Sequence, residues 1–279
     1  MVHFASRLLF ALETTGKIMN ENWIKDYQEK LGKLCAEYPA TLDMYSLKEC
    51  QPSILNSLVR KIFPSARALN VLGMQRAGNH IINHWMLEND RVATVYINNA
   101  TLYPGVADSV RVYYCDDTYP SQLEKILCTY ENVKVSKLVN LDPYYIIRDP
   151  YNWLASWMRH PEFNRETLEE NIETYIHNAE NCKKFIVYNQ WVSNVDYRNN
   201  LADELGFSNA DLGIDTIPEY GSGSSFDRHA YAGMGSQMKV SERWKILASD
   251  SDYLTAIKKY EKPFAFISKN ICEFSPPDL

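Results

Sequence analysis

A short loop bounded by Gly73 and Gly78 is the first place in this sequence where side chains and backbone could act together on a ligand. An apolar run precedes Gly73, and apolar residues resume at helical spacing after His80, so the pattern predicts a strand, a tight loop and a helix. Backbone N–H groups in the first turn of a helix have no intrahelical partner, and the helix dipole adds positive charge there. With Arg76 in the loop, the segment is typical of a phosphate-binding site.

The spacing of Gly73 and Gly78 matches a Walker A loop, but Asn79 and His80 replace the lysine and the serine or threonine that should follow. A Walker A loop uses that lysine to reach the outer phosphates and that hydroxyl to hold Mg²⁺. A P-loop nucleotide kinase or nucleotidase is therefore a disfavoured alternative. Two glycines can also simply close a strand-to-helix turn, and the loop alone does not decide between the two interpretations.

A second informative stretch runs from Arg148 to Ser156. Residues 144–147 form an apolar run that predicts a strand, and Asp149 and Pro150 suit the N-cap and the first position of a following helix. Arg148 would then end a strand, with Ser156 two turns into the helix, and both could face one anion. The alternative is that the turn only starts a helix and that Ser156 is an ordinary small residue packed against the sheet.

Together the two stretches resemble the P-loop sulfotransferase family, which transfers a sulfonate from 3′-phosphoadenylyl sulfate (PAPS) to a hydroxyl or an amine. In that family a loop of the type Y-P-K-S-G-T-T holds the 5′-phosphosulfate, and an R-x-x-x-x-x-x-x-S pattern, matched by Arg148 and Ser156, holds the 3′-phosphate. The resemblance covers roughly residues 67–247. It implies an α/β fold with a P-loop-type parallel β-sheet flanked by helices, PAPS as donor, adenosine 3′,5′-bisphosphate (PAP) as product, and no metal.

Two later segments are similar to the family's adenosine contacts. Tyr188 ends an apolar run that resembles the family's strand and Y-E-D turn, while Ser225 and Phe226 resemble its T-S-F segment. The family's late basic R-K-G element is not plainly present, and the candidates to replace it are Arg228, Lys239 and Arg243. The resemblance thus implies these nucleotide-binding residues: Gly73, Gln75, Arg76, Ala77, Gly78, Asn79, His80, Arg148, Ser156, Tyr188, Ser225 and Phe226.

The loop departs from the family pattern in its side chains. Arg76 stands for the usual lysine, and Ala77 is one of the positions where a hydroxyl is lost. Backbone N–H groups can still hold a phosphate, and the side chains of Asn79 and His80 carry N–H donors of their own. These departures leave open a second alternative, in which the protein is a catalytically silent nucleotide-binding or scaffold module.

Sulfuryl transfer depends on positioning and electrostatics, as phosphoryl transfer does, together with a base for the acceptor. Arg76 is expected to stabilise the charge that develops on the bridging oxygen. The resemblance implies Glu131 as the base, because it ends the strand that precedes the strand leading to Arg148. His80 and His84 are rivals for that role, since a neutral imidazole is a natural base near pH 7.

The elements that would position these residues predict one α/β domain over residues 67–279, preceded by a helical extension over residues 1–66. The extension could pack on the core or bind a partner or acceptor. A helix is expected before Gly206, and strands joined by crossovers predict a parallel sheet with its ligand beyond the C-terminal strand ends. The expected strands lie at 92–97, 126–130, 144–147 and 185–188.

Composition limits the classes of function. At 279 residues and 46% hydrophobic content, the chain can bury one large core. A formal net charge of −6 argues against a general nucleic-acid binder. Six cysteines without a CxxC pair indicate free thiols in a reducing compartment, and no apolar run is long enough for a membrane span. We therefore expect a cytoplasmic enzyme. The composition does not identify its acceptor, for which a small molecule or a glycan is the working expectation.

Overall fold

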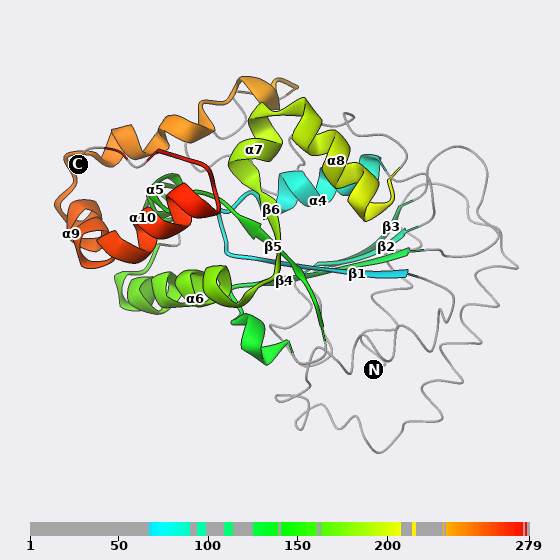
Figure 1. Ribbon diagram of the computed structural model, residues 1–279, viewed down its shortest axis with the longest axis horizontal. Helices are drawn as coiled ribbons and strands as arrows, with labels where there is room; N and C mark the ends of the chain where they lie inside the picture. Colours follow the sequence, from blue (N-terminus) through cyan, green and yellow to red (C-terminus); the bar gives the residue numbers. More distant parts are fainter. Residues whose placement is uncertain are drawn as a thin grey trace, which may run out of the picture. The chain divides into compact units, whose positions relative to one another are not determined.

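A computed structural model describes residues 67–89, 94–98, 109–113, 125–138, 141–160, 163–207, 214–215, 231, 233–275 and 277 (Figure 1). The helical extension predicted over residues 1–66 lies outside the described residues. The described residues divide into two compact units. The first holds those at 67–72 and 94–143, and the second holds those at 73–89 and from 144 onward.

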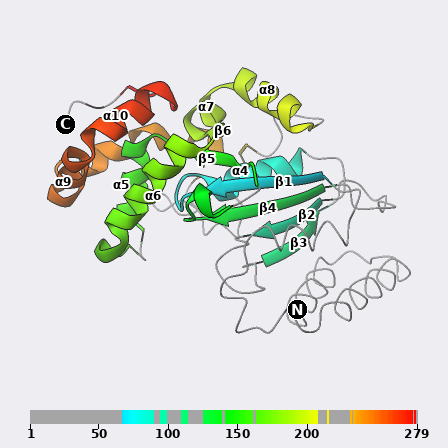
Figure 2. The same cartoon turned by 60° about the horizontal axis from the view of Figure 1, so that its bottom comes forward.

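The first unit is built on a sheet whose strands follow the order β3-β2-β4-β1 (Figure 2). The strands are β1 (Arg67–Gly73), β2 (Thr94–Asn98), β3 (Ser109–Tyr113) and β4 (Lys125–Glu131), and the 3-10 helix η2 (Val135–Lys137) follows β4. β2 runs parallel to β4 and antiparallel to β3. The strand expected at 126–130 is confirmed as β4, and the one expected at 92–97 appears as β2. The sequence did not predict β3.

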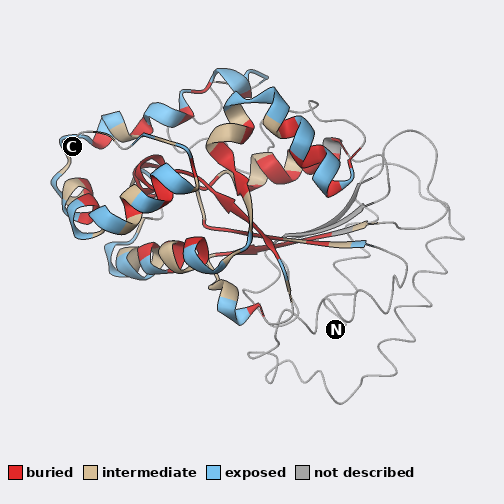
Figure 3. Ribbon diagram, in the orientation of Figure 1, coloured by how far each residue is buried: buried red, intermediate tan, exposed pale blue. Residues whose placement is uncertain are grey.

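The second unit contains the parallel strand pair β5 (Tyr144–Ile147) and β6 (Lys184–Val187), with Tyr144 opposite Lys184. All four residues of β5 are buried (Figure 3), which explains why the strand is wholly apolar rather than alternating. The crossover from β5 to β6 is helical, and α6 packs against β5. Parallel strands joined by helices confirm the α/β class.

Helices make up most of the second unit. α10 packs on α5, α6 and α9, and the 3-10 helix η6 packs on α5. The helices are α4 (Asn79–Glu88), α5 (Pro150–Met158), α6 (Leu168–Asn181), α7 (Tyr188–Ser193), α8 (Val195–Leu205), α9 (Ser251–Lys259) and α10 (Glu261–Asn270), with the 3-10 helices η3 (Arg165–Thr167), η5 (Gly235–Gln237) and η6 (Val240–Leu247). None of the described helices combines the length and the apolar character needed to cross a membrane.

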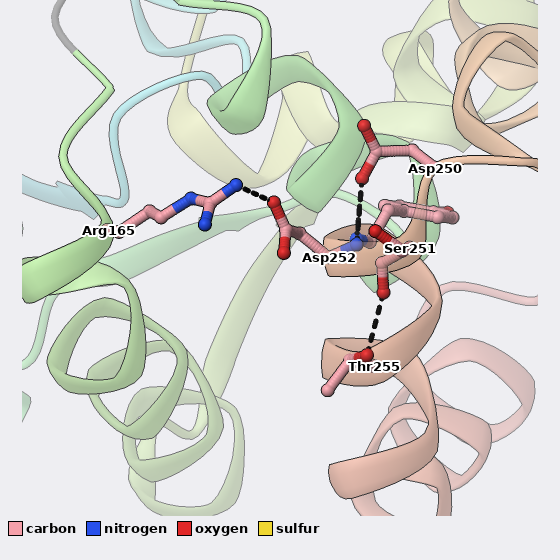
Figure 4. Close-up of polar contacts among 6 residues, drawn as sticks. Arg165, Asp250, Ser251, Asp252 and Thr255 are labelled. Carbon is pink, nitrogen blue, oxygen red and sulfur yellow. Dashed lines mark hydrogen bonds and ion pairs between the residues drawn. The ribbon is translucent and has the colours of Figure 1, made fainter.

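Local sequence signals fix several helix ends. α8 ends before Gly206, as the sequence predicted, and Gly206 caps it in the left-handed conformation with φ 73°. Asp250 caps α9 by accepting hydrogen bonds from the N–H groups of Asp252 and Tyr253. At the same helix start Arg165 forms an exposed ion pair with Asp252, which joins η3 to α9 (Figure 4).

The core of the second unit is aromatic. Trp153 of α5 stacks on Tyr175 of α6 with ring centroids 4.3 Å apart, and Trp85 of α4 meets Trp191 of α7 edge to face at 5.9 Å. Each such pair contributes roughly 0.5–1.5 kcal/mol of stability beyond that from burying its apolar area. They fix α4 and α7 to each other, and α5 to α6, which are the elements that carry the candidate site.

Three cysteines lie in the described residues, and all three are free, as predicted. Cys128 and Cys272 are buried, and Cys182 is half-buried. Burial raises the pKa of the Cys128 thiol to about 12, so this thiol is inert at neutral pH. The other three cysteines lie outside the described residues.

Candidate anion-binding site

The loop between β1 and α4 has a backbone of alternating handedness. Arg76 and Gly78 have positive φ angles of 70° and 103°, whereas Ala77 between them and Asn79 after them do not. Alternation of this kind is typical of the backbone nest that binds anions in P-loops, although the N–H of Ala77 donates within the loop to the carbonyl oxygen of Met74. A left-handed conformation costs a non-glycine residue such as Arg76 about 1 kcal/mol, and strain of this kind clusters at ligand sites.

Gly73 is required for a close approach inside the loop. A Cβ atom at Gly73 would lie 2.1 Å from Oδ1 of Asn79, so only glycine leaves room for the folded-back Asn79 side chain. Nδ2 of Asn79 donates a hydrogen bond to the carbonyl oxygen of Met74 at 3.0 Å, and the N–H of Ala77 donates to the same oxygen at 3.1 Å. The Asn79 side chain therefore braces the loop from within.

Gly78 is the N-cap of α4 and lies against an aromatic ring. A Cβ atom at Gly78 would lie 2.3 Å from Cδ2 of Tyr188. Gly78 has no side chain with which to cap the first-turn N–H groups of α4, and no acidic residue occupies that turn. The Tyr188 ring occupies the space a capping side chain would need, so residue 78 provides no side-chain cap for α4.

The strand expected at 185–188 appears one residue earlier, as β6. The strand β6 stops at Val187, and Tyr188 is the first residue of α7. Its ring is buried between the loop at Gly78 and the guanidinium of Arg148, whose Cζ lies 5.2 Å from the ring centroid. Tyr188 thus joins the two stretches that the sequence singled out.

Two guanidinium groups converge on Ser156. Nη1 of Arg148 donates to Oγ of Ser156 at 2.9 Å, and Nη1 of Arg243 donates to the same oxygen at 3.3 Å. Arg148 is only 1% exposed and Arg243 only 7%, so both cations are largely removed from water. We call Arg148 and Arg243 the arginine pair, and Ser156 is the serine that both of them contact.

The arginine pair places two positive charges side by side in a buried environment. Burial first and the neighbouring charge of Arg243 second lower the pKa of Arg148 to about 10, with a smaller contribution in the same direction from Arg76. Among the described residues no carboxylate lies within ion-pair distance of Arg148, and its Nε has no hydrogen-bond partner. Buried charges are costly unless paired, so an anion at this position would offset the repulsion and the desolvation.

The nearest carboxylate, Asp149, is held by other groups. It caps α5 by accepting from the N–H of Asn152 at 2.9 Å, and its Oδ2 accepts from Nδ2 of Asn189 at 2.7 Å. Burial raises the pKa of Asp149, while Arg148 and the two asparagines oppose that rise. Asp149 therefore completes the cap of α5 and ties α5 to α7.

Asn152 fixes the segment that carries Arg243. Its Nδ2 donates to the carbonyl oxygen of Ser241 at 3.1 Å, and its Oδ1 accepts from the N–H of Trp244 at 3.1 Å. Arg148 also donates to the carbonyl oxygen of Val240 through Nη2. η6 is thus held against α5, so the late cation is placed by specific hydrogen bonds.

No family model matches the chain, and searches of curated proteins and of solved structures find no match either. The interpretation of the site therefore depends on its own residues and geometry. In this geometry the loop, Tyr188 and the arginine pair with its serine belong to one compact unit. Positive charge and backbone donors gather there without a partner carboxylate for Arg148, which is the chemistry of an anion site.

The other residues predicted for the site differ in where they lie and in whether the structure describes them. Of the three late basic candidates, Arg243 joins Ser156, Lys239 is exposed, and Arg228 lies outside the described residues. Glu131 is the last residue of β4 in the first unit and is buried. Ser225 and Phe226 lie outside the described residues. His80 and His84 lie in the first and second turns of α4.

Sequence reasoning missed the residues that support the site through hydrogen bonds. Asn152 and Asn189 hold Asp149 and η6, and Nε1 of Trp153 donates to the carbonyl oxygen of Gln75 at 2.9 Å. The available signal was the position of Asn152 and Trp153 inside the stretch from Arg148 to Ser156. A buried indole or amide needs a partner, but the sequence does not say which one.

Proposed function

We propose that the protein is a sulfotransferase that moves a sulfonate from PAPS to a hydroxyl or an amine of a small-molecule or glycan acceptor. The observation that carries the proposal is the convergence of Arg148 and Arg243 on Ser156 Oγ, in the same unit as the loop at Gly73–Gly78. PAPS carries two anionic groups at opposite ends of its ribose. A backbone loop and a separate arginine pair suit these two groups.

In this proposal each end of the nucleotide has its own binding group. The loop holds the 5′-phosphosulfate through backbone N–H groups and Arg76, and the arginine pair with its serine holds the 3′-phosphate. A charge-assisted hydrogen bond to the additional phosphate contributes roughly 1.5–3 kcal/mol. Tyr188 lies buried between the two binding groups and contacts both of them.

The proposed reaction is an in-line transfer. The acceptor oxygen or nitrogen forms a bond to sulfur while the bond from sulfur to the bridging phosphate oxygen breaks, and PAP leaves with the negative charge. The proton of the acceptor passes to Glu131, and Arg76 stabilises the charge on the leaving oxygen. Both roles stay predictions from the sequence.

A second candidate is a protein that binds the nucleotide without transferring sulfonate. Asn79 favours this candidate, because its side-chain amide is engaged with the carbonyl oxygen of Met74 where the family has a hydroxyl donor. A kinase is less well supported, because Asn79 and His80 stand where it would need a lysine and an Mg²⁺-binding hydroxyl. Full activity in the presence of a metal chelator would exclude the kinase.

Transfer of labelled sulfonate from PAPS to panels of phenols, sugars and amines tests the proposal. We expect one acceptor class to take up label, at a rate that depends on Glu131. Glu131→Gln keeps the size of the side chain and removes its basicity, so turnover should fall by roughly 10²–10⁴-fold with donor affinity near normal. Tight binding of PAP with no transfer to any acceptor would support the binding module instead.

The matched variants His80→Asn and His84→Asn test the rival bases. If either of these abolished turnover while Glu131→Gln retained most of it, the base would be a histidine of α4. Glu131 would then be a positioning residue or a structural residue of β4. Donor affinity measured on all three variants separates loss of the base from loss of the nucleotide site.

A further inference from the structure

Trp153 links α5, the helix that carries Ser156, to the loop between Gly73 and Gly78. It lies on α5, three residues before Ser156, and its Nε1 donates to the carbonyl oxygen of Gln75 at 2.9 Å. The indole is fully buried and stacks on Tyr175. One side chain therefore contributes to the core with its ring and to the loop with its N–H.

This hydrogen bond also sets the direction of a loop donor. In a trans peptide the C=O and the following N–H point in opposite directions, and the described residues contain no cis peptide bond. Fixing the carbonyl oxygen of Gln75 on Trp153 therefore fixes the direction of the Arg76 N–H. Asn79 does the same for the preceding peptide by holding the carbonyl oxygen of Met74. Two successive peptide planes of the nest are thus oriented by side chains.

The bond at Trp153 is not simply what any buried indole must form. Trp157 on the same helix and Trp191 on α7 are also buried, and their Nε1 atoms have no hydrogen-bond partner among the described residues. The fold tolerates these indoles without such a bond. The bond from Trp153 to the loop is therefore a specific feature of this position.

We infer that Trp153 is a positioning residue that holds the loop in its anion-binding form and couples it to α5, the helix that carries Ser156. The inference rests on the proposed function, because it assigns the loop to the 5′-phosphate end of the nucleotide. A loop carbonyl released from Trp153 could turn its negative end toward that anion. Weaker 5′-phosphate binding follows, while the arginine pair keeps its own contacts.

The test compares Trp153→Phe with the matched control Trp157→Phe, using adenosine 5′-monophosphate and adenosine 3′-monophosphate in titration calorimetry. Both variants replace an indole on α5, but only the first removes a hydrogen bond to the loop. We expect Trp153→Phe to weaken binding of the 5′-monophosphate roughly tenfold and to change binding of the 3′-monophosphate less than about twofold. Trp157→Phe should leave both affinities within about twofold of the wild-type values.

Hydrogen exchange of the ligand-free protein gives a readout that does not depend on nucleotide. Amides of the Gly73–Gly78 loop should exchange roughly tenfold faster in Trp153→Phe and at the wild-type rate in Trp157→Phe. Equal affinities and equal loop exchange in the two variants would overturn the inference while leaving the proposed function standing. An equal loss for both nucleotides in Trp153→Phe would also overturn it. If the wild-type protein bound neither nucleotide, the proposed function and this inference would fail together.

Discussion

The second unit contains two strand-to-helix turns that solve the same problem in opposite ways. At the turn from β5 to α5, Asp149 caps the helix, Pro150 occupies its first position, and the first-turn donors are met from within the protein. At the turn from β1 to α4, the cap is Gly78, which has no side chain and lies under the ring of Tyr188. One turn is closed by its own carboxylate, and the other has no side-chain cap.

This difference indicates which groups of each turn can bind an anion. The capped turn has no backbone N–H to offer at its N-cap, so it acts through the side chains of Arg148 and Ser156. The uncapped turn acts through its backbone, whose handedness alternates at Arg76 and Gly78. We therefore expect the loop to be sensitive to changes in backbone and space, and the capped turn to be sensitive to loss of side-chain atoms.

The largest expected effect on stability is that of Gly78→Ala. The new Cβ would lie 2.3 Å from the buried ring of Tyr188, and the alanine backbone would have to keep a φ of 103°. We therefore expect the free energy of unfolding to fall by about 3 kcal/mol. Gly233→Ala is the matched control, because Gly233 has a φ of 73° with no atom within 4 Å of its Cβ position. The control should lose about 1 kcal/mol in urea denaturation, and equal losses would contradict the role of Tyr188.

Asp149→Asn tests the capped turn. The substitution puts an amide where Asn152 and Asn189 both donate hydrogen bonds, and we expect the free energy of unfolding to fall by about 2 kcal/mol. The cost should depend on pH. Because burial raises the pKa of Asp149, its contribution to stability is greatest below the ordinary aspartate pKa near 4 and declines as pH rises through its native value.

Chemical denaturation of both proteins from pH 3.5 to 7 measures this dependence. The difference in stability between wild type and Asp149→Asn should shrink as pH rises. A difference that instead grew with pH would mean that the charged carboxylate is the favoured native form. The cap would then depend on the charge of Asp149 more than on its hydrogen bonds.

Arg243→Gln should weaken binding of PAP roughly tenfold while changing the stability of the free protein by less than about 1 kcal/mol. The reason is that Arg243 adds repulsion to the buried Arg148 in the absence of an anion. Arg198→Gln is the contrasting variant, because buried Arg198 donates to the carbonyl oxygens of Trp191 and Val192. The Arg198→Gln variant should have a lower free energy of unfolding and an unchanged affinity for the nucleotide. The opposite pattern for the two arginines would assign Arg243 to the fold.

The smallest expected effect separates the charge of Arg76 from its backbone strain. Arg76→Ala and Arg76→Gly both remove the guanidinium, so both should slow sulfonate transfer more than they weaken nucleotide binding. Glycine also relieves the left-handed conformation, and the Gly variant should be about 1 kcal/mol more stable than the Ala variant. Normal transfer rates in both variants would make the loop a passive cradle.

Strand and helix ends could be predicted from the sequence because the residues that mark them lie close together in the chain. The apolar run Tyr144–Ile147, the cap Asp149 and the N1 residue Pro150 define the turn from β5 to α5 as the structure has it. Gly206 likewise marks the end of α8. Each of these features depends on residues within one helical turn of one another, which is the range that sequence patterns describe.

Features that depend on distant parts of the chain could not be predicted in the same way. Arg243 meets Ser156 across 87 residues, and Trp153 meets Gln75 across 78. The apolar run that ends at Tyr188 was expected from the sequence, but the contact of its ring with Gly78 was not, because the two residues lie far apart in the chain. β3 was missed because Ser109 and Arg111 interrupt the kind of apolar run that marks the predicted strands.

The most direct measurement is titration calorimetry of the wild-type protein with PAP and with adenosine 5′-monophosphate. These nucleotides differ only in the 3′-phosphate, the group proposed to lie on Arg148, Arg243 and Ser156. We expect PAP to bind roughly 10- to 100-fold more tightly, as a charge-assisted contact to a buried pair of arginines requires. Equal affinities for the two nucleotides would contradict the assignment of the arginine pair and, with it, the central claim that this unit is a two-anion nucleotide site.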